Sequence, residues 1–161
     1  MKVGGHMKRI MFVCSGNVCR SVMAEYLFKE VLKQRKILDN YEVCSSGVFA
    51  YDGQTPPKEV IDAMAGQGID ITGHRSKTTD SIDVNNLDLI LCMTSSQKLQ
   101  LKRRYKEVQD KIYTLKEYII YDGGINEDID IDSPESGDWK EYLECLRQIS
   151  ICVDKLVRLL E

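Results

Sequence analysis

Residues 8–26 read KRIMFVCSGNVCRSVMAEY. The apolar run 10–13 ends at Cys14, small and turn-forming residues follow, and a helical pattern begins at Val22. The pattern predicts a strand, a short loop and a helix. Such a loop directs backbone N–H groups inward at the N-terminus of the helix, where they form a binding site for an anion.

Two side chains give this anion site its chemistry. Cys14 stands at the entrance of the loop and Arg20 at its exit. The loop, the helix end and the guanidinium all favour the thiolate form of the cysteine. Arg20 also carries a planar fork of donors that suits phosphate oxygens. A thiolate beneath a bound phosphate is positioned for in-line attack on phosphorus.

Length and composition narrow the class of protein. The chain has 161 residues, of which 43% are hydrophobic and 29% charged, which predicts one domain with its own core. The net charge of −3 gives no reason to expect a nucleic acid partner, and no apolar run approaches the length of a membrane span. The sequence makes no prediction of the oligomeric state.

The cysteines and the N-terminal residues bear on where the protein is located. Six cysteines without the spacing of a small disulfide scaffold, and no visible secretory signal, favour a reducing cytoplasm. Residues 1–6 precede a second methionine, Met7, and we expect them to be an added leader or a disordered end. The predicted domain therefore covers residues 7–161.

The remaining pattern alternates strands with helices. Strands are predicted over 10–14, 41–48, 87–93 and 111–118, the last with the alternative of a short strand running into a helical turn; helices are predicted over 22–36, 57–68 and 97–107, and from Asp138 to the C-terminus. An acidic loop covers 119–138, and Glu141 gives the last helix a capping-box-like start. This order predicts an α/β fold of three layers, with a four-stranded parallel sheet, helices on both faces and the phosphate-binding loop after the first strand. Cys14 then lies at the carboxyl ends of the strands, where such sheets bind ligands.

The interval between Cys14 and Arg20 is weak evidence by itself. Cys152 and Arg158 have the same spacing, but they lie in a periodic apolar helix without glycine. We interpret that second match as core packing with a surface arginine. The context of Cys14, between a strand and a helix, carries the inference.

Several segments resemble one protein family. The segment 14–21, followed by 23–25, resembles the signature of the low molecular weight protein tyrosine phosphatases. Segments that look like family segments follow in the family order at 45–50, 74–76, 91–93 and 114–118. The last of these, together with 47–50, is most similar to the bacterial branch that includes protein arginine phosphatases.

The resemblance implies a hydrolase that acts on phosphorylated proteins in two steps. Cys14 would attack the phosphate and form a phosphocysteine, and an aspartate in a late loop would protonate the leaving group and then activate water. The resemblance implies no metal and no cofactor, and phosphate or sulfate would fit the loop. It assigns the phosphate-binding loop to Ser15, Gly16, Asn17, Val18, Cys19 and Ser21, with Ser45 and His74 supporting its shape.

Two assignments keep an alternative. The resemblance implies that Cys19 is a disulfide partner that protects the oxidised nucleophile, and packing of the loop is an equal interpretation. Tyr51 falls where the family has an aromatic wall beside the phosphate pocket, and a loop tyrosine without a role is nearly as well supported. The other four cysteines are assigned to packing: Cys44, Cys92, Cys145 and Cys152.

The general acid is where the sequence departs from the family. Residues 128–135 read DIDIDSPE, so Ser133 precedes Pro134 where the family has aspartate. A serine hydroxyl holds its proton too tightly for this role. We predict Asp132 as the donor and Asp130 as the reserve; the alternative is that neither carboxylate reaches the substrate.

The substrate is predicted from two residues near the site. Val18 has the shape of threonine without its hydroxyl and cannot bond a guanidinium, which favours phosphotyrosine or another aryl phosphate. Glu135 and the bacterial-branch segments favour phosphoarginine, which we keep as the alternative. Two other classes are less well supported. An arsenate reductase would need two further thiols in a mobile loop, whereas Cys92 lies in a predicted core strand, and a binding module would not need Cys14.

Overall fold

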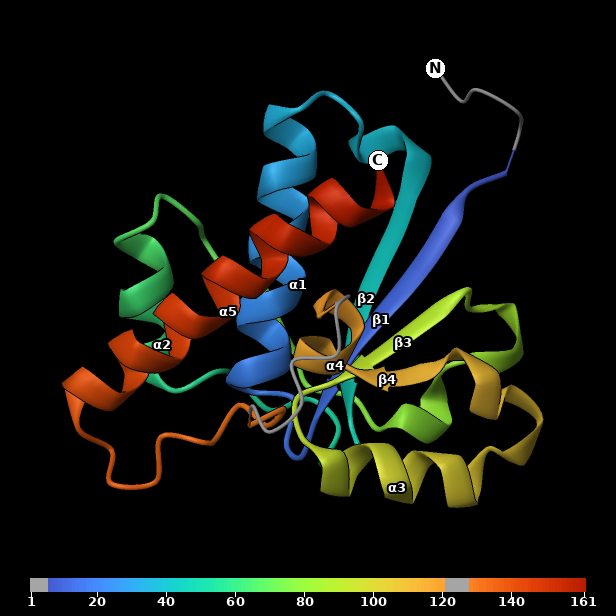
Figure 1. The fold of residues 1–161 in the computed structure, drawn as a ribbon. Helices are drawn as coiled ribbons and strands as arrows, with labels where there is room; N and C mark the ends of the chain where they lie inside the picture. The colour runs from blue at the N-terminus through green and yellow to red at the C-terminus, as the bar shows by residue number, and fades with distance from the viewer. Residues whose placement is uncertain (1–5, 121–127) are drawn as a thin grey trace.

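The computed structural model describes residues 6–120 and 128–161 (Figure 1). Its strands are β1 (Lys8–Cys14), β2 (Tyr41–Gly47), β3 (Leu89–Cys92) and β4 (Ile112–Thr114). Its α-helices are α1 (Arg20–Gln34), α2 (Lys58–Ala65), α3 (Ser95–Arg104), α4 (Leu115–Ile119) and α5 (Trp139–Leu160). Short 3₁₀ turns lie at Leu38–Asn40, Thr79–Ser81, Val84–Asn86 and Lys106–Lys111.

The four strands form one parallel sheet in the order β2-β1-β3-β4. Since β1 is central, Ile10 pairs with Val43 of β2 on one side and with Leu89 of β3 on the other. At the carboxyl end of the strand, Cys14 pairs with Gly47. The predicted three-layer α/β fold is confirmed, and the register brings the end of β2 beside the predicted anion loop.

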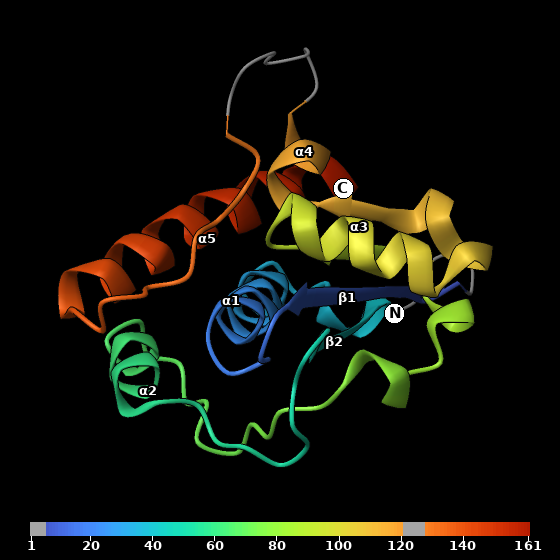
Figure 2. The same cartoon turned by 90° about the horizontal axis from the view of Figure 1, so that it is seen from below.

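The alternation of side chains along β1 builds two cores. Ile10, Phe12 and Cys14 face a core that includes residues of α1, α2 and α5. Met11 and Val13 face the other core, which includes Leu101 of α3. Because successive side chains of a strand point to opposite faces, a wholly apolar strand requires cover on both sides. Figures 1 and 2 show α1 and α5 on one side of the sheet and α3 on the other.

The alternative prediction for residues 111–118 matches the structure. The chain leaves β4 at Thr114 and turns at once into α4. A capping box fixes this turn, since the Thr114 hydroxyl accepts from the backbone N–H of Glu117, and the Glu117 carboxylate accepts from that of Thr114.

The predicted capping box of the last helix is wrong. The Asp138 carboxylate accepts from the backbone N–H of Lys140, 3.2 Å away, so Asp138 does cap α5. The Glu141 carboxylate accepts instead from the backbone N–H of Ser136. The chain before α5 turns back on the helix start and offers Glu141 a different donor.

Parts of two predictions lie outside the described residues, namely 1–5 of the expected leader and 121–127 of the expected acidic loop. Within 6–120 and 128–161, no helix is long and apolar enough to cross a membrane. In the same residues, no three His, Cys, Asp or Glu side chains group in a way that could hold a metal ion.

Candidate active site

The loop between β1 and α1 is held against the end of β2. The backbone N–H groups of Val48 and Phe49 donate to the carbonyls of Cys14 and Ser15, at 3.0 and 2.9 Å. A Cβ added at Gly47 would lie 2.5 Å from the carbonyl oxygen of Ser15. Only glycine allows the two backbones to approach this closely. The glycine therefore fixes where the loop sits relative to the sheet.

Asn17 organises the inside of the loop. Its backbone is left-handed (φ 56°), a conformation that asparagine tolerates better than most residues, and its side chain is fully buried. The side-chain amide nitrogen donates to the hydroxyls of Ser21 and Ser45, each at 2.9 Å. Its oxygen accepts from the backbone N–H of Lys77 at 3.1 Å. One side chain thus ties the loop to α1, β2 and the segment after His74.

The hydrogen bonds of Asn17 orient the Ser21 hydroxyl toward the Cys14 sulfur. The Ser21 hydroxyl lies 2.9 Å from the Cys14 Sγ and already accepts from Asn17. Its own proton is therefore free to point at the sulfur, where it stabilises a thiolate. On the other branch, the Ser45 hydroxyl accepts from Asn17 and donates to the buried Glu25 carboxylate at 2.5 Å.

The ring of His74 supports the loop by a hydrogen bond to the loop backbone. The ring is buried, and its Nε2 lies 3.0 Å from the carbonyl oxygen of Asn17, which can only accept, so Nε2 carries the proton. Burial is the main influence on this ring and lowers the pKa of His74 below its usual value. The neutral ring donates one hydrogen bond that helps to hold Asn17 in its left-handed conformation. The Tyr26 ring packs edge-on against it, with the ring centres 5.8 Å apart.

Arg20 joins the anion loop to the late loop that follows residue 127. The guanidinium is only 7% exposed, and its Nη1 donates to the carbonyl of Ile131 at 2.9 Å. The backbone N–H of Ile131 donates in turn to the carbonyl of Met93, just beyond β3. Ile131 is buried. The residue before Asp132 is therefore anchored to both the arginine and the sheet.

The two candidate acids lie on either side of Ile131 in different surroundings. The Asp130 carboxylate accepts from the backbone N–H of Ser95 at 2.7 Å, at the start of α3. Lys116 donates to the Asp130 carbonyl at 3.1 Å. Asp132 is exposed and lines a small pocket with Ser133, Pro134 and residues of α5. The structure thus uses Asp130 at a helix start and leaves the carboxylate of Asp132 beside a pocket.

The other predicted loop residues have varied surroundings. Ser15 accepts from the side-chain amide of Gln97 at 3.1 Å, while Gly16 and Val18 are half-buried. Cys19 precedes α1, is half-buried and packs against the core that includes residues of α1, α2 and α5. Tyr51 is 75% exposed, and its carbonyl accepts from the Ser76 hydroxyl.

Sequence reasoning missed three residues at this site. Glu25 is a buried carboxylate on α1, and its position four residues after Ser21 could have placed it on the same helix face. Gln97 completes a capping box with Thr94 and also reaches Ser15, a contact with no sequence signal. Phe49 is 64% exposed, and its backbone N–H donates a hydrogen bond to the carbonyl of Ser15. It is therefore a second exposed aromatic residue beside the loop.

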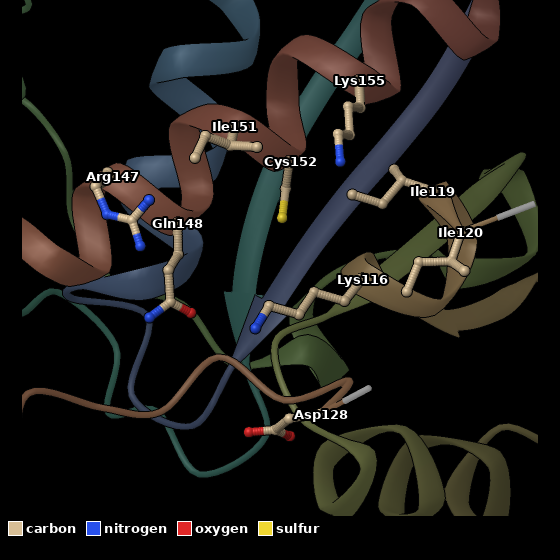
Figure 3. A pocket seen from close by; sticks show the side chains of 9 residues that line it. All are labelled: Lys116, Ile119, Ile120, Asp128, Arg147, Gln148, Ile151, Cys152 and Lys155. Carbon is tan, nitrogen blue, oxygen red and sulfur yellow. The ribbon is translucent and has the colours of Figure 1, made fainter. Parts of the chain in front are cut away.

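The second Cys–Arg match is not part of this site. Cys152 lies on α5, is buried, and lines a different pocket between α4 and α5 (Figure 3). In Figure 3 the side chains of Lys116, Arg147 and Lys155 surround that pocket, with Ile119 and Ile151 among its apolar lining. The interpretation of Cys152 as a packed helix residue agrees with this position.

Comparisons with known proteins agree with the geometry. A sequence model of the family described as "Low molecular weight phosphotyrosine protein phosphatase" matches residues 9–161. A probable low molecular weight protein-tyrosine-phosphatase, EpsP of Ralstonia solanacearum, is 32% identical over 94% of this chain and 94% of its own length. A protein-arginine-phosphatase of Geobacillus stearothermophilus is also 32% identical, over 95% of this chain and 96% of its own length.

A solved structure bears on the loop chemistry. It is a mutant of the YwlE arginine phosphatase with a phosphorylated active-site serine. It superposes on this chain with a TM-score of 0.85 at 29% identity, covering 94% of this chain and 95% of its own.

Proposed function

The chain belongs to the low molecular weight phosphotyrosine protein phosphatase family, and from this premise we propose that it hydrolyses protein phosphotyrosine through a phosphocysteine on Cys14. The observation that carries the proposal is the set of hydrogen bonds around the Cys14 sulfur. The Ser21 hydroxyl lies 2.9 Å from that sulfur and is oriented by Asn17. A packing cysteine would not need a buried hydroxyl oriented toward it.

The first step transfers the phosphoryl group to sulfur. The Cys14 thiolate attacks phosphorus, the bond from phosphorus to the leaving oxygen breaks, and the general acid gives that oxygen a proton. Arg20 and the loop N–H groups bind the phosphoryl oxygens and stabilise the charge that develops on them. The phosphorylated active-site serine of the YwlE mutant supports a covalent intermediate at this position.

The second step releases phosphate. The carboxylate left by the first step takes a proton from water, and the water oxygen attacks phosphorus while the sulfur–phosphorus bond breaks. Inorganic phosphate leaves and the thiolate returns. The two steps use the same carboxyl group in opposite protonation states, so the mechanism requires no other proton carrier.

We assign the acid to Asp132. Its neighbour Ile131 accepts from Arg20, so the Asp132 backbone starts one residue from a group that binds phosphate. Its carboxylate is exposed beside a pocket, whereas that of Asp130 is bonded to the start of α3. The departure from the Asp-Pro pattern then amounts to a shift of one residue along the late loop.

Leaving-group dependence tests both assignments. Cys14→Ser should abolish turnover of every aryl phosphate. For an aryl phosphate whose phenol has a high pKa, Asp132→Asn should slow hydrolysis on the order of 10²–10⁴-fold. For an aryl phosphate with an activated phenol, the variant should have little effect, because that phenolate leaves without a proton. Asp130→Asn is the matched control, with no dependence on the leaving group. If Asp130→Asn shows that dependence and Asp132→Asn does not, the two roles are reversed; activity in Cys14→Ser refutes the covalent mechanism.

Phosphoarginine is the second candidate substrate. The exposed Glu135 would suit a cationic guanidinium, and the Geobacillus relative is a protein-arginine-phosphatase. Val18 favours phosphotyrosine because its side chain has no hydrogen-bonding atom. Rates on matched phosphotyrosine and phosphoarginine peptides, repeated with Val18→Thr, separate the two. We expect the wild type to prefer phosphotyrosine and the variant to gain phosphoarginine activity; a strong wild-type preference for phosphoarginine would reverse the assignment.

The partners and location follow from the same chemistry. We expect phosphorylated proteins as substrates, phosphate or sulfate as loop ligands, and no nucleic acid partner at a net charge of −3. The six cysteines are all free in the structure, which supports a reducing cytoplasm. We expect the exposed Tyr51 and Phe49 to offer aromatic surfaces to an aryl substrate, since the Phe49 backbone N–H donates to the Ser15 carbonyl of the loop.

A further inference from the structure

A cavity of about 180 Å³ lies between α4, α5 and the late loop. Part of its wall is apolar and comes from Ile119, Ile120 and Ile151, while Lys116 and Lys155 contribute ammonium groups. In Figure 3 the two lysine side chains extend toward the same space, one from α4 and one from α5. The volume is more than ten times the roughly 10–15 Å³ that seats one water molecule, so the cavity has room for a small organic molecule.

The cavity carries an excess of positive charge. Among the described residues, Lys116, Arg147 and Lys155 line it together with one carboxylate, that of Asp128. Glu144 lies beside the cavity and accepts from the Arg147 Nε and Nη2, at 2.8 and 2.6 Å. When this carboxylate is counted as well, one positive charge is left without a balancing negative group.

Lys155 is the cation best placed to bind a ligand. Its ammonium has no hydrogen-bond or ion-pair partner within 6–120 and 128–161, whereas Lys116 bonds a backbone carbonyl and Arg147 is held by Glu144. A monoanion balances the remaining charge, with its charged head at the lysines and its apolar part against the isoleucines. A phosphate monoester, with a charge of about −1.5 to −2 at neutral pH, fits this balance less well than a carboxylate.

The same cavity borders the groups that hold the late loop. Lys116 donates to the carbonyl of Asp130 at 3.1 Å, and the Asp128 carboxylate accepts from the backbone N–H of Asp130 at 2.9 Å. Both backbone polar groups of Asp130 are therefore bonded to side chains that line the cavity. The next residue accepts from Arg20, and Asp132 follows it.

We propose that this cavity binds a small organic monoanion, a carboxylate with an apolar tail of a few carbon atoms, and that the bound anion slows the acid step. The carboxylate competes with the Asp130 carbonyl for the Lys116 ammonium and repels the carboxylate of Asp128. Both bonds to the Asp130 backbone weaken, so the residues that follow lose their fixed position. This effect rests on the proposed function, in which Asp132 protonates the leaving group, whereas the binding site does not.

Binding is tested with hexanoate as the probe and with hexanamide as its uncharged counterpart. In an NMR titration of the ¹⁵N-labelled full chain, hexanoate should shift the backbone amide signals of 151–155 and saturate with a Kd on the order of 1 mM, as expected for a ligand of this size. Hexanamide has nearly the same shape without the charge, so it should bind at least about tenfold more weakly.

A pair of lysine variants locates the site. Lys155 is exposed, so Lys155→Met should fold, and the loss of its charge should weaken hexanoate binding at least about tenfold. Lys33 is the matched control, because it is an exposed lysine near the end of α1 and outside the cavity. Lys33→Met should bind hexanoate like the wild type. The site is overturned if hexanoate binding does not saturate, if hexanamide binds equally well, or if Lys155→Met binds like the wild type.

Kinetics test the regulation separately. Saturating hexanoate should lower kcat about 3- to 10-fold for an aryl phosphate whose phenol has a high pKa, less than the ~10²-fold that a misplacement of 1 Å can cost. It should have little effect on an aryl phosphate with an activated phenol, or on Lys155→Met with either substrate.

The outcomes distinguish the site, the regulation and the proposed function. A competitive effect that persists in Lys155→Met would place hexanoate in the phosphate-binding loop and overturn the proposal. Binding at Lys155 without a change in kcat for the poor leaving group would overturn the regulation. If hexanoate binds at Lys155 but the protein hydrolyses no aryl phosphate, the binding site stands and the proposed function is refuted.

Discussion

Replacing Asn17 by alanine removes the side chain on which the phosphate-binding loop depends. The change deletes three hydrogen bonds, to Ser21, Ser45 and the backbone of Lys77. It also places a residue with a Cβ and no compensating local hydrogen bond at φ 56°. Asn17 is fully buried, so water does not readily replace the lost partners.

The expected cost is the sum of these two effects. Three buried hydrogen bonds contribute roughly 3 kcal/mol at about 1 kcal/mol each. A left-handed backbone costs an L-residue such as alanine about 1–2 kcal/mol. We therefore expect Asn17→Ala to lower the free energy of unfolding by about 4–5 kcal/mol, a large part of the roughly 5–15 kcal/mol that holds a typical domain together.

Asn17→Gly separates the two effects. Glycine loses the same three hydrogen bonds but adopts φ 56° without steric cost, while its freedom in the unfolded chain costs about 0.5–1 kcal/mol. The glycine variant should therefore be more stable than the alanine variant by roughly 0.5–1 kcal/mol, the difference between these two terms. Urea unfolding followed by far-UV circular dichroism measures both. Turnover of an aryl phosphate by the folded glycine variant should fall because the Ser21 hydroxyl is no longer oriented toward Cys14.

Two results would refute this reasoning. If Asn17→Ala is as stable as Asn17→Gly, the left-handed backbone is not a constraint on the loop. If Asn17→Gly unfolds like the wild type and keeps its turnover, the hydrogen bonds of Asn17 neither stabilise the loop nor orient Ser21.

Two further predictions concern the supports of the loop. Gly47→Ala would put a Cβ 2.5 Å from the carbonyl oxygen of Ser15, so it should lower the unfolding free energy by about 1–3 kcal/mol and reduce kcat/KM. Gly73→Ala is the control, because nothing lies within 4 Å of the added Cβ, and it should change the stability and kcat/KM little. Equal urea midpoints for the two alanine variants would contradict this. Burial holds the pKa of His74 below its unfolded value of about 6.5, so the unfolded chain takes up a proton first as the pH falls. The free energy of unfolding should therefore decrease below about pH 6.5, by at most about 1.4 kcal/mol per pH unit. His74→Gln should remove this component from urea titrations between about pH 7 and pH 5; a variant with the wild-type slope would show that another group is responsible.

The sequence was most informative where structure is local. The strand, the loop and the start of the first helix could be predicted because residues 10–22 change from apolar to turn-forming to helical within a short stretch. Element ends were less certain, and the capping box predicted at Asp138 was wrong because a neighbouring backbone N–H, that of Ser136, competes for Glu141. Such competition depends on how the preceding chain turns, which residue spacing does not show.

The candidate site depends on residues that are far apart in the chain. Asn17 could be singled out from its loop, but its contact with Ser45 requires β2 to pair with β1 in a register that brings Gly47 beside Cys14. His74 reaches Asn17 across 57 positions of the sequence. Resemblance to a family suggested these residues, while spacing alone would have left His74 as a surface histidine.

Residues 10–22 are sufficient to predict an anion loop between a strand and a helix, with a cysteine at its entrance and an arginine at its exit. Short-range backbone preferences and hydrophobic periodicity are enough to build that unit. The groups that meet this unit depend on the tertiary structure: Glu25 lies behind Ser45, and Ile131 lies against Arg20. The physical reason is that such contacts form when whole elements dock, and docking follows from sheet register and core packing rather than from any local pattern.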